Sequence, residues 1–288
     1  MELDTDTKRE AVASRELLQA DVLGTVSHEL RGPLTAIKGY ATTLLRHERH
    51  LGREERQQFL QAIAEASDRL ELIIERLLEV SELETGQVTL QLSPVDMAYL
   101  AGEALIAIEE RVENKAPGRF SFRLALQHMD GTSAHSLPLV LADPRRLREV
   151  LDNLLDNAIQ YSPDGGTVSV VIRPVMQMWP VPVDELEAHM VSRQMAGIPA
   201  TPALRNMLEI CVCDEGQGIP ADQLERIFNR FHRVDTRLIR ESNGLGLGLA
   251  ICKYLVELHH GLIWAENKSG GHGSIFHIRL PVGEEPVR

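Results

Sequence analysis

Apolar side chains recur every three or four residues over two segments, residues 8–46 and residues 59–80, with a polar stretch between them. In the second segment the steps alternate between four and three, which is the heptad spacing of helices that pack side by side. Two long helices joined by a short turn predict an antiparallel hairpin. One hairpin cannot cover both of its apolar edges, but pairing with a second copy into a four-helix bundle would cover them. A monomeric hairpin resting on the next domain is the alternative.

After residue 86 the pattern changes to short strands and helices. Alternating or β-branched runs predict strands at 87–92, 120–126, 137–143, 167–173, 207–214, 262–267 and 273–281. Helices are predicted at 93–112, 144–162 and 245–260. The first would open with Ser93 as its cap and Pro94 behind it, and the second with Asp143 and Pro144. This order predicts an α/β layer structure with helices on one face of a sheet.

Segment 174–206 does not fit this order. It holds five prolines and four methionines between two predicted strands, and so long a connection is unusual in a compact domain. Its middle, residues 184–195, has the pattern of a short amphipathic helix, and the segment is either a functional insertion or a floppy loop. We therefore expect an α+β protein with a helical domain at 1–87 and a mixed domain at 88–288, interrupted by the insertion at 174–206.

Charge and composition narrow the functions open to the chain. A formal charge of −12 over 288 residues argues against a nucleic-acid partner, although a few local arginines could still bind a nucleotide. No apolar run is long enough to span a bilayer, so we expect no membrane contact within this chain and a cytoplasmic location. Cys211 and Cys213 would point the same way on a strand. They are either a redox or metal pair or, as we favour, small buried hydrophobic residues.

Most of the histidines have ordinary interpretations. His47 and His50 have a spacing that can bind metal, but they fall in the polar turn, where exposure is the simpler interpretation. His259 and His260 end a predicted helix, where a positive charge suits the helix dipole. His28 differs, because Glu29 follows it directly on an apolar helical pattern that continues past Pro33.

Three polar residues share one face of the helix predicted at 144–162. Asn153, Asn157 and Tyr161 are four apart. Asparagine is a poor helix former, so two on one face of an otherwise apolar helix indicate a polar task. Amide oxygens can bind a hard cation such as Mg²⁺ and leave room for phosphate oxygens. The alternative is a helix with two satisfied polar residues.

One glycine-rich segment follows a predicted strand, and another leads into a predicted helix. In DEGQGIP, Asp214 would emerge at a strand end and could accept from the amine of adenine, while Gly216 and Gly218 would let the flat base approach. An ordinary turn is the alternative. In ESNGLGLGL, Gly244, Gly246 and Gly248 lead into a helix and could present N–H groups to phosphate. No strand precedes them, which excludes a Rossmann motif. Nearby Arg230 and Arg233 could meet phosphates.

These motifs occur in an order that resembles one family. SHELRGPLTAI, LDNLLDNAIQYS, DEGQGIP, IFNRFHRVD, GLGLGLAI and GHGSIFHIRLP together resemble the catalytic core of a sensor histidine kinase of two-component signalling. The likeness extends from about Asp21 to Pro281. It implies a dimerising hairpin followed by an α/β sandwich of the type shared by gyrase, Hsp90 and histidine kinases.

The resemblance assigns roles to individual residues. His28 would accept the phosphoryl group, Glu29 would hydrogen-bond its imidazole, and Pro33 would kink the helix. Asp214 would bind adenine, Asn157 would hold Mg²⁺ with Asn153 close by, and a lid would cover the phosphates of ATP. The expected nucleotide-binding set comprises Asn153, Asn157, Tyr161, Asp214, Gly216, Gly218, Ile219, Arg230, Phe231, Arg233, Gly244, Leu245, Gly246, Leu247, Gly248 and Leu249.

Two positions depart from the family pattern. Gly32 stands where relatives often carry threonine or asparagine, whose side chain is thought to position the water that dephosphorylates the response regulator. Its lack of a side chain predicts weak phosphatase activity. Gln160 replaces a frequent lysine ahead of Tyr161, which removes one possible phosphate contact.

The resemblance implies a homodimeric, Mg-ATP-dependent kinase that phosphorylates His28 and passes the group to an aspartate of a response regulator receiver domain. Two other functions compete with it. One is a different ATPase or chaperone-like switch with the same nucleotide fold, which would not need the His28–Glu29 pair. The other is a docking module that has lost kinase activity, which the retained asparagines and glycines argue against.

Overall fold

The computed structural model describes residues 24, 26–27, 29–47, 50–85, 88–179, 203–234, 245–270 and 272–283. The chain divides into two structural units. One contains the helical residues 29–46 and helix α2 (Arg53–Thr85), and the other contains a five-stranded sheet and three helices. Among the described residues, no helix combines the length and the apolar character that crossing a bilayer demands.

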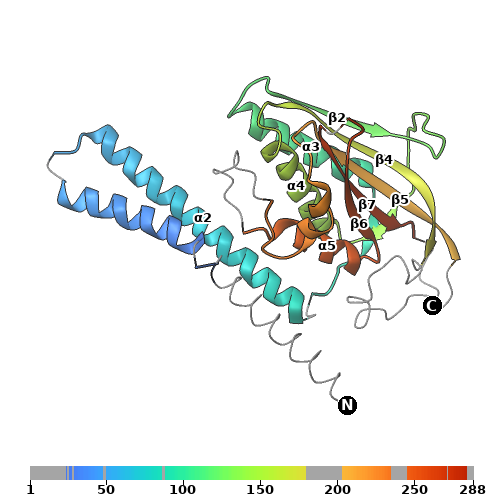
Figure 1. The fold of residues 1–288 in the computed structure, drawn as a ribbon, viewed down its shortest axis with the longest axis horizontal. Coiled ribbons are helices and arrows are strands. Elements are labelled where there is room, and N and C mark those ends of the chain that lie inside the picture. Colours follow the sequence, from blue (N-terminus) through green and yellow to red (C-terminus); the bar gives the residue numbers. More distant parts are fainter. Residues whose placement is uncertain are drawn as a thin grey trace, which may run out of the picture. The chain divides into compact units, whose positions relative to one another are not determined.

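The first unit is the predicted antiparallel hairpin (Figure 1). The rings of Tyr40 and Phe59 stack at 5.5 Å, and Arg69 Nη2 lies 3.4 Å from Glu29 Oε2. As the position falls from 40 to 29 on one helix, its partner rises from 59 to 69 on the other, which is the register of antiparallel helices. The helix continues through Pro33, whose ring is buried.

The second unit is a sheet with helices on one face (Figure 1). Its strand order is β2-β4-β5-β7-β6, in which only β2 and β4 pair in parallel. A short pair, β1 with β3, lies beside it. The strands are β1 (Ser93–Val95), β2 (Phe120–Leu126), β3 (Val140–Ala142), β4 (Gly166–Trp179), β5 (Ala203–Cys213), β6 (Leu262–Asn267) and β7 (Ser274–Pro281). The helices are α3 (Met97–Glu113), α4 (Pro144–Gln160) and α5 (Gly248–Leu258).

The core of this unit lies between the sheet and the helices. Along β5, alternate side chains point to opposite faces, and Leu208, Ile210 and Val212 are at most 1% exposed. On α4, the apolar positions three and four apart are equally buried, as at Leu151 and Leu155. The predicted layer arrangement is therefore confirmed.

The start of the mixed domain was predicted wrongly. Residues 88–92 form no strand; the strand is Ser93–Val95, and α3 begins four residues later than expected. The cap is Asp96, whose carboxylate accepts from Ala98 N at 2.9 Å and Tyr99 N at 3.2 Å. A carboxylate caps a helix as well as a serine does, so the Ser-Pro signal lost to a second cap three residues downstream.

The interruption between β4 and β5 is shorter than predicted. Both strands continue into segment 174–206, and their pairing runs out to Trp179 opposite Ala203. Pro174 lies inside β4, opposite Leu208. A proline is tolerated there because β2 pairs with β4 only as far as Ile172, so the missing N–H faces an edge with no ladder to maintain. The remainder of the segment, including the helix predicted at 184–195, lies outside the described residues.

The cap predicted for α4 is confirmed, and its contact with His259 corrects the charge predicted for that histidine. The Asp143 carboxylate accepts from Arg145 N at 3.0 Å, with Pro144 behind it. The backbone N–H of Asp143 donates to Nε2 of His259 at 3.0 Å, and the other ring nitrogen of His259 lies 2.7 Å from the Leu255 carbonyl. Burial lowers the pKa of His259, and an accepting Nε2 requires the neutral ring. The expectation of a positive charge is therefore wrong at His259.

Candidate functional site

Helix α4 and the C-cap residue that follows it, Tyr161, present the three polar residues found in the sequence, and all three are half-buried. Asn153 Nδ2 donates to the Glu149 carbonyl at 3.0 Å, which leaves Oδ1 as the atom available to a ligand. A side chain at Gly248 would bring its Cβ within 3.0 Å of that Oδ1. The first turn of α5 therefore approaches Asn153 closely, and glycine provides the space.

Asp214 lies just past the end of β5 and is 2% exposed. Its Oδ1 accepts from Gly216 N at 2.8 Å and from Ser274 N at 3.1 Å. The hydroxyl of Ser274 donates to Oδ2. These donors satisfy a carboxylate that is shut off from water, and one acceptor position on Oδ2 is still available to a ligand N–H.

The loop after Asp214 is attached to the end of α4. Gln217 N donates to the Tyr161 carbonyl at 3.3 Å. A Cβ at Gly216 would lie only 2.3 Å from that same carbonyl oxygen, so no residue with a side chain fits there. Gly218 adopts a left-handed φ of 74°, which glycine reaches without strain. Both glycines of the motif thus have a steric reason, and Gly216 lets the start of the loop pack against the Tyr161 carbonyl.

The loop is also fixed from other strands. The Glu215 carboxylate accepts from Thr167 N at 2.9 Å, and Gly273 N donates to the Gly216 carbonyl at 2.7 Å. Sequence reasoning missed Gly273 and Ser274 as site residues, although their motif, GHGSIF, was recognised. The signal was a glycine and serine at the start of the last strand, where a backbone crosses close to Asp214.

Arg233 is electrostatically coupled to Tyr161. Burial raises the pKa of the Tyr161 phenol, and the positive charge of Arg233 opposes that rise. Arg230 and Arg233 are both exposed, while Phe231 is half-buried with φ 60°. A left-handed φ is unusual for an aromatic residue and marks strain at functional segments.

The glycine run is described only in part. Gly244 lies outside the described residues. Leu245 and Leu247 are buried, Gly246 has φ 66°, and Gly248 and Leu249 begin α5.

On the hairpin unit, His28 also lies outside the described residues. Its neighbour Glu29 has a side chain only 12% exposed, with the Arg69 guanidinium 3.4 Å from its carboxylate. Four positions after His28, Gly32 is exposed, and a Cβ there would meet nothing within 4 Å.

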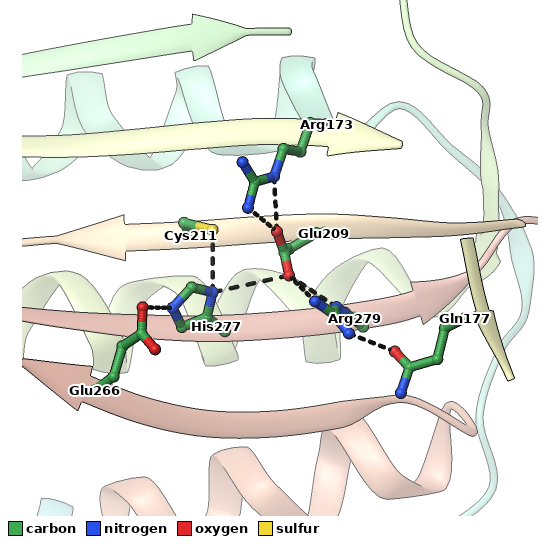
Figure 2. Close-up of polar contacts among 7 residues, drawn as sticks. All are labelled: Arg173, Gln177, Glu209, Cys211, Glu266, His277 and Arg279. Carbon is green, nitrogen blue, oxygen red and sulfur yellow. Dashed lines mark hydrogen bonds and ion pairs between the residues drawn. The ribbon is translucent and has the colours of Figure 1, made fainter. Parts of the chain in front are cut away.

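A second polar cluster lies on the sheet face away from the helices (Figure 2). Glu209 is fully buried, yet it is flanked in register by Arg173 on β4 and Arg279 on β7. Each arginine takes one carboxylate oxygen, at 2.6 to 2.7 Å. Burial by itself would raise the pKa of Glu209, but the hydrogen bonds from the two arginines outweigh it and lower the pKa.

The same cluster contains metal-ligating residue types. Ligand atoms of Glu209, Cys211 and His277 lie within 4.8 Å of one another. Burial and the charge of Glu209 raise the pKa of Cys211 to about 12, so it is a neutral thiol. Two guanidinium groups already occupy Glu209 and would repel a cation. We therefore interpret the cluster as a structural ion network, and Cys211 and Cys213 as the small buried residues expected from the sequence.

Comparison with known proteins follows the two units. Residues 18–86 match the family model described as His Kinase A (phospho-acceptor) domain. Residues 142–284 match the model described as Histidine kinase-, DNA gyrase B-, and HSP90-like ATPase. The two models thus describe a phospho-acceptor domain followed by an ATPase domain, and their bounds fall largely on the helical unit and on the mixed unit.

Curated relatives align along most of the chain. The circadian input-output histidine kinase CikA of Synechococcus elongatus is 32% identical over 91% of this chain and 30% of its own length. The sensor protein KdpD of Clostridium acetobutylicum is 30% identical over 95% of this chain and 26% of its own length. The adaptive-response sensory kinase SasA of Prochlorococcus marinus is 29% identical over 96% and 62%. The chain thus spans between about a quarter and three fifths of these relatives.

Two solved structures share the fold. The Acinetobacter baumannii histidine kinase AdeS superposes with a TM-score of 0.57 at 23% identity, over 89% of this chain and 98% of that one. Full-length ShkA in complex with AMPPNP gives 0.56 at 24% identity, over 92% and 47%. Both family models match, in the order in which the motifs occur along the chain, and relatives named as histidine kinases align along most of it. The chain therefore belongs to the sensor histidine kinases of two-component signalling.

Proposed function

We propose that the chain is a protein histidine kinase core that phosphorylates His28 from Mg-ATP and passes the phosphoryl group to an aspartate of a response regulator. The observation that carries the proposal is the buried Asp214, which keeps an acceptor available beside the two glycines. The amino group of adenine can donate to that acceptor, whereas guanine would present a carbonyl to a carboxylate.

The phosphate side of the site would be formed by α4 and the start of α5. Asn153 and Asn157 offer amide oxygens, which suit a hard cation such as Mg²⁺, and the Nδ2 bond of Asn153 leaves its Oδ1 free to serve. Bound there, Mg²⁺ would screen the charge of the phosphates. The N–H groups at Gly248 and Leu249 belong to the first turn of α5, where the helix dipole favours an anion.

Glu29 would assist the acceptor on the hairpin. The attacking imidazole nitrogen of His28 forms a bond to phosphorus as the bond from phosphorus to the ADP oxygen breaks. The carboxylate of Glu29 would hold the N–H of the ring in the orientation that this attack needs. The guanidinium of Arg69, 3.4 Å from the Glu29 carboxylate, would help to hold that carboxylate in place.

The partners follow from the hairpin. Its exposed apolar side chains include Leu34, Leu45, Leu60, Ile74 and Leu78, a surface that a second copy would cover in a four-helix bundle. A receiver domain would approach His28 on this bundle. Buried thiols without disulfides suit a cytoplasmic location.

The test uses the chain with γ-³²P-ATP and Mg²⁺. Wild type should acquire label that acid removes and alkali preserves, because phosphohistidine is acid-labile. His28→Gln should acquire less than about a hundredth of it, in line with loss of a nucleophile. Undiminished label on His28→Gln would overturn the proposal. Nucleotide binding without any label would favour the ATPase or docking alternatives.

A further inference from the structure

Asn267 makes two hydrogen bonds to one residue of the base-binding loop, residues 214–219. Its Oδ1 accepts from the N–H of Ile219 at 2.7 Å, and its Nδ2 donates to the carbonyl of the same residue at 2.7 Å. A carboxamide that bonds both backbone groups of one residue copies the pairing of a neighbouring strand. It therefore fixes the peptide planes on either side of Ile219.

The position of Asn267 explains why this matters for the loop. It is the last residue of β6 and pairs directly with Ser274, the first residue of β7. Ser274 binds Asp214 at the beginning of the loop, and Asn267 binds Ile219 at its end. Two adjacent residues of one strand pair thus set the distance between the two ends of the loop.

The loop needs such an anchor because its backbone is unusual. Gly218, which precedes Ile219, has a left-handed φ of 74°, a conformation that glycine samples freely in a flexible chain. Without a partner for Ile219, Gly218 could rotate and displace the surface on which the base would lie. Asn267 is half-buried, so losing its bonds would also leave polar groups with poor access to water.

We propose that Asn267 is a positioning residue for the nucleotide base: through Ile219 it holds the loop that carries Asp214 in its binding shape. The inference rests on the proposed function, because the loop has a base to bind only if the chain binds adenine nucleotides. The role assigned to Asn267 is to hold the loop, and no contact with the reacting phosphate is assigned to it.

The test compares three variants with wild type. Asn267→Ala removes both bonds to Ile219. Asn267→Asp is isosteric and keeps the acceptor for the Ile219 N–H, but it cannot donate to the carbonyl. Asn206→Ala is the matched control, because Asn206 is an exposed asparagine near the opposite end of β5 from Asp214. Each protein is titrated with MgADP by calorimetry and assayed for autophosphorylation over a range of ATP concentrations, below its thermal transition.

Asn267→Ala should weaken MgADP binding about tenfold and raise the ATP concentration for half-maximal rate by the same factor. Each of the two lost hydrogen bonds accounts for about threefold. Asn267→Asp should weaken binding at least as much, because its second carboxylate oxygen would face the Ile219 carbonyl oxygen in place of the donor. The maximal rate should stay within about twofold of wild type for both, because the phosphates and the acceptor are untouched. Asn206→Ala should match wild type throughout.

The possible failures are distinguishable. If wild type binds no MgADP, the proposed function itself is wrong. If wild type binds and the two Asn267 variants bind equally well, Asn267 is structural and only this inference falls. A fall in maximal rate with unchanged nucleotide affinity also overturns it. Should Asn267→Ala not fold, the isosteric Asn267→Asp decides.

Discussion

The carboxylate of Asp214 stands out in the sequence because an apolar strand precedes it and two glycines follow it within four residues. Its partner Ser274 is 60 positions away. Only the pairing of β5 with β7, which ends at Cys213 opposite Ile275, brings the two together. A local pattern can therefore identify the charged residue of a site, while the groups that hold it depend on strand register.

Asn267 was missed for the same reason and for one more. It ends a strand of ordinary composition, and nothing in its neighbours marks it as polar by necessity. Its two bonds go to backbone groups of Ile219, and backbone groups leave no trace in a sequence. Asn153, by contrast, was identifiable because asparagine is costly on an apolar helix face.

Gly32 offers a prediction at this scale. A Cβ there would meet no atom within 4 Å, so Gly32→Thr should be accommodated without rearrangement. Threonine also has a higher helix propensity than glycine, so stability should not fall. If a hydroxyl at this place positions the hydrolytic water, the variant should dephosphorylate its receiver domain in the presence of ADP about tenfold faster than wild type, an effect of about 1.4 kcal/mol on the barrier.

The control for this prediction is Gly32→Ala. Alanine gives the same or greater gain in helix propensity but carries no hydroxyl. Phosphate release from a labelled receiver measures all three proteins. Equal rates for the threonine and alanine variants, or a wild-type rate already as high as that of the threonine variant, would refute the assigned role.

At the scale of elements, periodicity predicted the long segments well and the short ones poorly. The helix that became α4 was placed to within two residues, because its cap, its proline and its apolar spacing agree. The three-residue strand β1 was misplaced, and β3 occupies only three residues of the strand predicted at 137–143. Such short elements owe their conformation to their pairing with each other, and three residues carry too little periodicity to show it.

His259 joins two of these elements and predicts a pH dependence. Its neutral ring accepts from Asp143 N at the start of α4 while it lies at the end of α5. Burial lowers its pKa in the folded state, although the Leu255 carbonyl and the Asp143 carboxylate oppose this. Below the unfolded pKa of about 6.5, the unfolded chain takes up a proton that the folded chain refuses, so stability falls as pH falls from there towards the folded pKa.

The measurement is the free energy of unfolding between pH 8 and pH 5. His259→Gln should lower stability by about 1–2 kcal/mol at pH 8 through the altered hydrogen bonds, and it should flatten the decline towards pH 5. His135→Gln, at an exposed histidine, should keep the wild-type decline. If His259→Gln loses stability towards acid as steeply as wild type, another group causes the effect.

At the scale of the molecule, the sequence predicted a helical part followed by a part of mixed strands and helices, and the structure forms two units. The helical seam proposed from the heptads is used within the hairpin, where Ala66 and Ile73 are buried. A second apolar surface of the hairpin, which includes Leu60 and Leu78, remains exposed. This surface is the one through which two copies of the chain would associate. The charged network around Glu209 could not be foreseen, because it depends on three strands meeting in register.

That second surface gives the last prediction. Leu60 and Leu78 lie on one face of α2, because the 18 residues between them complete five helical turns. Their side chains are 59% and 60% exposed. Burying a leucine stabilises by about 1.5–3 kcal/mol, and a symmetric dimer would bury each of them twice. Leu60→Asp with Leu78→Asp should therefore weaken association at least a hundredfold and give a monomer in sedimentation equilibrium at micromolar concentration.

The matched control is Ile106→Asp, because Ile106 is 56% exposed on helix α3 of the other unit. It carries the same change of charge on a helix, and it should leave the mass of the particle unchanged. The double variant should still bind MgADP as wild type does, because every nucleotide-binding residue proposed on α4 and on the Asp214 loop is unaltered. A double variant that sediments as a dimer would show that some other surface holds the copies together, and the apolar face of α2 would then need a different occupant.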